Sequence, residues 1–73
     1  MEKRRSNKFL KKLALRIKEL REKHGVTQAN FYNDTGVNIG RIERAKRDFS
    51  MTSFEIICKY FEITPAEFFK DID

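Results

Sequence analysis

The sequence predicts an all-α fold, a compact bundle of five short helices, and three observations lead to this prediction. Apolar residues recur at helical spacings, no segment alternates as a strand does, and the links between segments are too short for crossover connections. A chain of 73 residues, of which 40% are hydrophobic and 37% charged, supports one small folded core. We divide it into a flexible basic arm, residues 1–6, and one domain, residues 7–73.

The first helix is predicted from Asn7 to the His24-Gly25 pair, where Gly25 suits the left-handed residue that ends many helices. Charged side chains fill most of its surface. Its inner face is marked by a run at spacings of three and four, namely Leu10, Leu13, Ile17 and Leu20.

A second helix is predicted over about residues 28–32. Thr27 is its expected N-cap, and its apolar side chains are Phe31 and Tyr32. Asn33 and Asp34 are expected to form the turn after it.

A third helix is predicted after this turn, with Thr35 as its N-cap. Its inner stripe consists of Ile39 and Ile42, which are three residues apart and therefore lie on one face.

Two capping boxes predict the last two helices. Residues 52–55 (Thr-Ser-Phe-Glu) open a fourth helix, and residues 64–67 (Thr-Pro-Ala-Glu) open a short fifth helix that carries Phe68 and Phe69. The inner face of the fourth helix is predicted to be Phe54, Ile57, Cys58 and Phe61.

Three stretches resemble the Cro/phage-repressor (Xre) family of helix-turn-helix DNA-binding domains: residues 16–28, 40–47 and 57–69. The first is similar to the family's RIRELREKKGLTQ, the second to its SRIERGKR and the third to its IAKALGVSLDELF. The resemblance implies a five-helix, lambda-repressor-like fold. It also implies that the second and third helices form the helix-turn-helix and that the third enters the major groove of DNA.

The chain departs from this family pattern in two places. The stretch from Gln28 to Glu43 is about three residues shorter, close to one helical turn. The gap shortens the second helix and its turn if Thr35 caps the third helix, or shortens the third helix if Gly36 is the turn glycine; we prefer the first placement. Ala45 stands where the family usually has glycine, so the exit from the third helix is expected to differ.

The resemblance implies a DNA-binding surface on the third helix and around it. Asn38 is expected to bind adenine, unless it is merely solvated, Arg41 to bind guanine or a phosphate, and Val37 to meet a thymine methyl. The predicted DNA-binding residues are Gln28, Thr35, Val37, Asn38, Gly40, Arg41, Arg44, Lys46 and Arg47.

Supporting roles follow from the same resemblance. Gln28 is expected to bond a phosphate and to support a base-reading side chain, or else to be a plain polar residue of the first turn. Lys46 and Arg47 are expected near phosphates. Gly36 and Gly40 either allow close approach to the groove or mark a poorly formed helix.

The resemblance also implies that Glu43 pairs with an arginine of the first helix. Arg16 is expected to touch phosphate or to lie on a solvated face. Residues 3–5 (Lys-Arg-Arg) form either an arm along DNA or a tail. Phe69 and Ile72 follow an already satisfied inner face, so they form either a homodimer surface or a contact under the first helix.

The charge pattern favours a polyanionic partner. The net charge is +5, and residues 1–25 hold ten Lys or Arg against three acids, whereas residues 51–73 hold two against five. Single Cys and His residues exclude an internal disulfide and a Cys/His metal site. No catalytic set, cofactor loop or membrane span is present, so we expect a non-enzymatic, cytoplasmic protein without cofactors.

These observations predict a sequence-specific regulator of transcription that binds double-stranded DNA, as a homodimer through Phe69 and Ile72. A chain of this length suggests repression by promoter occlusion. The alternative is an antitoxin, or another protein-interaction module of a toxin–antitoxin or mobile-element system, that binds a protein partner. The acidic last third with its two adjacent phenylalanines motivates that alternative.

Overall fold

A computed structural model describes residues 7–46, 48–70 and 72. Within these residues the chain forms five α-helices and no strand, which confirms the predicted all-α fold. None of the described helices is both long enough and apolar enough to cross a membrane. The helices are α1 (Asn7–Lys23), α2 (Gln28–Thr35), α3 (Ile39–Glu43), α4 (Met51–Tyr60) and α5 (Pro65–Lys70).

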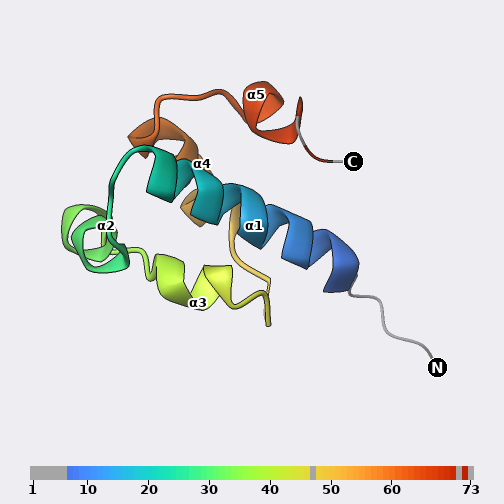
Figure 1. Ribbon diagram of the computed structural model, residues 1–73, viewed down its shortest axis with the longest axis horizontal. Coiled ribbons are helices and arrows are strands. Elements are labelled where there is room, and N and C mark those ends of the chain that lie inside the picture. The colour runs from blue at the N-terminus through green and yellow to red at the C-terminus, as the bar shows by residue number, and fades with distance from the viewer. Residues whose placement is uncertain (1–6, 47, 71, 73) are drawn as a thin grey trace.

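The longest helix, α1, runs through the middle of the molecule, and α3 and α5 lie on opposite sides of it (Figure 1). Its predicted inner face is buried, and so are the predicted inner faces of the third and fourth helices. Phe31, Ile17, Ile39, Ile57 and Phe68 are fully buried. The remainder of the core cluster is Leu10, Leu13, Leu20, Ile42, Phe54, Cys58 and Phe61.

The turn between α2 and α3 differs from our expectation. Thr27 caps α2 as predicted, since its Oγ1 accepts a hydrogen bond from the backbone N–H of Asn30 at 3.0 Å. The helix then continues to Thr35, whose Oγ1 donates to the carbonyl of Phe31 at 2.8 Å. The prediction that Thr35 caps the third helix is therefore wrong. Gly36 makes the turn at φ +78°, a conformation that glycine adopts without the Cβ clash of other residues.

The shortening relative to the family pattern falls on α3. Asn38 is its N-cap, with Oδ1 accepting from the N–H of Arg41 at 3.1 Å, and the helix has only five residues. The placement that we prefer from the sequence is wrong, and the alternative with Gly36 as the turn glycine is correct. The side-chain amide of Asn38 supplies the cap that the prediction assigns to Thr35.

The last two helices begin at serine and threonine caps. α4 starts two residues earlier than predicted, because Ser50 and not Thr52 is its N-cap and accepts from the N–H of Ser53 at 3.0 Å. The capping box of α5 is confirmed in both directions. Thr64 N–H donates to Glu67 Oε1 at 2.8 Å, and Glu67 N–H donates to Thr64 Oγ1 at 3.0 Å.

Among the described residues, two that are not glycine adopt left-handed backbone conformations at helix ends. Ala45, after α3, has φ +59°, and Glu62, after α4, has φ +58°. Gly25 ends α1 at φ +68°, as predicted. The expectation that alanine changes the exit from α3 is wrong, because Ala45 takes the left-handed conformation in spite of its Cβ. The backbone conformation at this exit is therefore strained.

Candidate nucleic-acid interface

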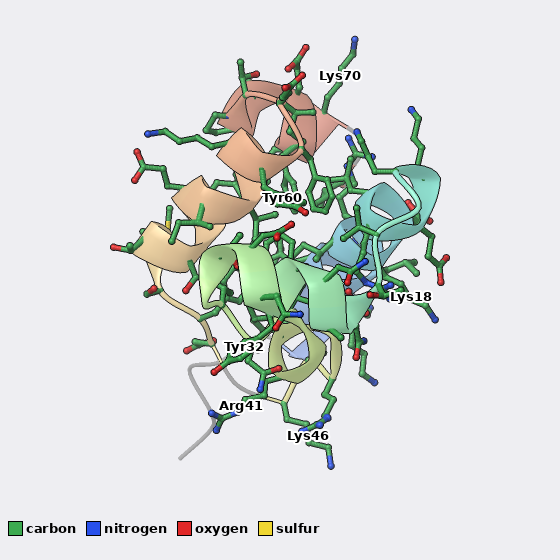
Figure 2. The ribbon with its side chains drawn as sticks, turned by 90° about the vertical axis from the view of Figure 1, so that its left-hand side faces the viewer. Lys18, Tyr32, Arg41, Lys46, Tyr60 and Lys70 are labelled. Carbon is green, nitrogen blue, oxygen red and sulfur yellow. The ribbon has the colours of Figure 1, made fainter. Side chains whose placement is uncertain are left out.

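The exposed cations of the helix-turn-helix gather at one end of the molecule. Arg41 and Lys46 project from this end, opposite the end that carries Lys70 of α5 (Figure 2). Arg44, the C-cap of α3, is also exposed. Of the predicted phosphate contacts, Arg47 lies outside the described residues, as does the predicted basic arm at residues 1–6.

A bidentate ion pair between Arg21 and Glu43 holds α3 against α1. Arg21 Nε donates to Glu43 Oε2 at 2.7 Å, and Arg21 Nη2 donates to Glu43 Oε1 at 3.0 Å. The two side chains are 12% and 7% exposed, and the Glu43 hydrogen bond raises the pKa of Arg21. The predicted bracing role of Glu43 is confirmed. Because this geometry uses both carboxylate oxygens, the pair sets the orientation of α3 as well as its distance.

Gln28 takes part in the same contact with Glu43 of α3, and Gly40 lies beside Gln28. Gln28 Nε2 donates to Glu43 Oε1 at 3.0 Å, so this glutamine at the start of α2 is tied to α3. Gly40 faces it: a Cβ at position 40 would lie 2.9 Å from Gln28 Oε1. The structure thus gives Gly40 a role that neither sequence interpretation includes, since its missing side chain leaves room for the Gln28 amide.

Two other predicted reading residues have structural roles. Asn38 is exposed, but its Oδ1 caps α3, so its amide is held in one orientation at the start of the helix. The capping oxygen retains a second lone pair, and the same amide can therefore still meet a base edge. Val37 is partly buried against the core, which limits what it can present to a thymine methyl.

Arg16 contacts α5. Its Nε donates to the carbonyl of Phe68 at 3.2 Å and its Nη2 to the carbonyl of Glu67 at 3.4 Å. Its guanidinium also lies 5.8 Å from the centre of the Phe68 ring. The expectation of a solvated face is wrong, because this arginine joins α1 to α5. The helix that it contacts, α5, lies on the opposite side of α1 from α3 (Figure 1).

Tyr32 is exposed at this end of the molecule, which the sequence interpretation does not anticipate. That interpretation groups it with Phe31 as the apolar contribution of α2, but Phe31 is fully buried and Tyr32 is 54% exposed. It lines the same groove as Arg41, and both lie at this end of the molecule (Figure 2). The helical period offers the missed signal, because consecutive residues on a helix point about 100° apart and cannot both face the core.

An apolar surface lies next to this groove, and Asp48 and Phe49 line both. Phe69 is 40% exposed, and it shares a shallow groove with Phe9 and Met51, which are 44% and 73% exposed. Ile72, the other residue of the predicted homodimer surface, is partly buried against the core. The exposed apolar side chains of this surface are therefore Phe9, Met51 and Phe69.

Comparison with known proteins identifies the family. A model of the Cro/C1-type HTH DNA-binding domain matches residues 16–73, which is most of the chain and includes all five helices in whole or in part. No curated protein and no solved structure matches the chain. The match supports a DNA-binding regulator, in agreement with the exposed cations around α3. The chain belongs to the Cro/C1-type HTH DNA-binding domain family.

Proposed function

We propose that this protein is a sequence-specific DNA-binding repressor that acts by occupying the promoter it recognises. The observation that carries the proposal is the braced α3 with exposed Arg41 upon it. The Arg21–Glu43 pair holds the helix on the domain, so a side chain on its outer surface is presented in a defined position. Such preorganisation reduces the ordering that binding must impose.

Arg41 is the base-reading residue of this proposal, because a guanidinium makes a bidentate contact to guanine in the major groove. Asn38, at the start of the same helix, reads an adjacent base. Arg44 and Lys46 contact phosphates, which supply register and affinity but no sequence information. Gln28 donates one N–H of Nε2 to a phosphate at the start of α2, while the other N–H of the same nitrogen stays on Glu43.

A symmetric dimer extends the proposal to an operator with two half-sites. The surface predicted from Phe69 and Ile72 is supported in part by the exposure of Phe69 beside Phe9 and Met51. Two copies joined through it would place their α3 helices on half-sites about 34 Å apart, one turn of DNA.

Fluorescence anisotropy tests the proposal directly. The wild-type protein is titrated, at about 150 mM salt, into the duplex upstream of its own gene and into a scrambled duplex of the same length and composition. Specific binding that is tighter by about a thousandfold supports a sequence-reading regulator. Equal and salt-sensitive binding to both duplexes contradicts operator recognition at this promoter, since counterion release alone gives that behaviour.

The antitoxin alternative predicts a different result. A protein-interaction module would use the exposed apolar surface of Phe9, Met51 and Phe69, and a small basic toxin would co-purify with the chain when their genes are expressed together. Replacing Met51 by Lys should then abolish co-purification while DNA binding is retained. Under the repressor proposal, no toxin co-purifies, and M51K weakens self-association and, with it, binding to an operator with two half-sites.

A further inference from the structure

A polar groove of about 740 Å³ lies beside α3. Its walls come from four places: α2, the turn that leads to α3, the outer side of α3, and the segment that enters α4. Tyr32 lines the α2 side, Asn38 the turn, Arg41 the α3 side, and Ser50 the entry to α4. Because the groove adjoins the proposed reading helix, whatever lies against Arg41 also lies in or next to this groove.

The charge of the groove suits a polyanion. Three cations line it, Arg41, Arg44 and Lys46, against a single described carboxylate, that of Asp48. All four of these residues are exposed. A strand of DNA carries one negative charge per nucleotide, so a groove with this excess of positive charge attracts it and releases bound counterions.

Tyr32 is placed to contact such a strand with its hydroxyl. Its neighbour Phe31 is fully buried and packs against the Tyr60 and Phe61 rings, which fixes this part of α2 on the core. Tyr32 itself is 54% exposed, and no hydrogen bond within the described part of the chain engages its hydroxyl. In contrast, the Tyr60 hydroxyl donates to Asp34.

We propose that this groove holds one phosphodiester strand of the bound DNA and that the Tyr32 hydroxyl donates a hydrogen bond to a phosphate oxygen. This inference rests on the proposed DNA-binding function and adds a residue to its interface. The contact is independent of base sequence. It positions the strand next to α3, where Arg41 reads the adjacent base.

Two substitutions of a tyrosine by phenylalanine form the matched test. Tyr32→Phe removes a hydroxyl from the groove, whereas Tyr60→Phe removes the same atom from the other tyrosine, away from the groove. Each variant is titrated by anisotropy against the upstream duplex and the scrambled duplex, between about 50 and 200 mM salt. Thermal unfolding of both variants checks that they are folded at the temperature of the titration.

The affinity and its salt dependence together distinguish a neutral contact with phosphate from a charged one. Tyr32→Phe should weaken binding about tenfold on both duplexes, because a hydrogen bond to a charged group is lost. The salt dependence should be unchanged, since a hydroxyl displaces no counterion. Lys46→Ala provides the comparison, because losing a cation should lower the slope of log K against log[salt] by about one. Tyr60→Phe should bind as the wild type does.

The outcomes separate this inference from the proposed function. If the wild type binds DNA and Tyr32→Phe binds within twofold of it, the Tyr32 contact is refuted while the DNA-binding function stands. A loss on only one of the two duplexes refutes the phosphate assignment. If the wild type binds neither duplex at any salt concentration, the proposed function and this inference both fall.

Discussion

Replacing Glu43 by glutamine changes only one heavy atom of the side-chain carboxylate, but it should destabilise the domain strongly. Glu43 accepts hydrogen bonds from two nitrogens of Arg21 and from Gln28 Nε2. The Glu43→Gln side chain keeps one acceptor oxygen but brings an N–H₂ group toward those donors. It also leaves the Arg21 cation, which is 12% exposed, without its counter-charge.

The magnitude follows from the burial of the pair. Removing one partner of a fully buried ion pair costs about 3–5 kcal/mol, whereas exposed pairs contribute about 0–1 kcal/mol. The Arg21 and Glu43 side chains are 12% and 7% exposed, so the pair lies near the buried limit, and one acceptor remains. We therefore expect E43Q to lower the free energy of unfolding by about 2–3 kcal/mol, which lowers Tm by about 10–20 °C.

Urea unfolding followed by circular dichroism measures this loss without screening charges. The matched control is Glu55→Gln, because Glu55 pairs with Lys59 at 3.5 Å while the two side chains remain 64% and 77% exposed. That control should lose less than about 0.5 kcal/mol. If E43Q loses no more than the control does, the Arg21–Glu43 pair does not hold α3 on the domain.

Three further predictions test other features. Ala45→Gly should raise the free energy of unfolding by about 0.5–1 kcal/mol, because it relieves the left-handed conformation at φ +59°. As a control, Ala29→Gly should lower the free energy of unfolding measured in urea, because it replaces a favourable helix former within α2. Gly40→Ala should leave stability within about 1 kcal/mol, since improved helix propensity offsets the displaced Gln28 amide. Anisotropy should nevertheless show weaker binding to DNA, and unchanged affinity would remove Gln28 from the interface. Cys58 is buried and its burial raises the thiol pKa, so iodoacetamide at pH 8 should modify it only after unfolding in urea. Rapid modification of the native protein would contradict that burial.

The helices and the core are predictable because their signals are local or periodic. The inner face of α1 follows from the spacing of its leucines and Ile17, and the start of α5 from the pairing of Thr64 with Glu67. Such patterns do not depend on distant residues. They are sufficient for the number and order of the helices, although the predicted start of α4 is wrong by two residues.

The turn before α3 is harder to predict, because the sequence offers two caps within four residues. Thr35 and Asn38 can both cap a helix, and Gly36 can either end α2 or lie inside α3. Local preference does not decide between these arrangements. The choice depends on how Ile39 and Ile42 reach the core, and that packing is a property of the whole fold.

Contacts between distant residues limit the prediction of the interface. The Arg21–Glu43 pair can be predicted only from the family resemblance. The hydrogen bond from Arg16 to Phe68 joins residues 52 positions apart, and no local sequence pattern indicates it. The exposure of Tyr32 can be predicted from helical periodicity, because its neighbour Phe31 points into the core. The identity of the bases that Arg41 reads depends on the docked geometry of DNA.

Selection of duplexes from a randomised library tests the central claim most directly, because the operator sequence need not be specified in advance. The wild type and Arg41→Ala are used in parallel, and the bound duplexes are sequenced. We expect the wild type to enrich one motif and Arg41→Ala to lose preference at one position of it, at a cost of about 1–3 kcal/mol. If the wild type enriches no motif, α3 does not read DNA sequence.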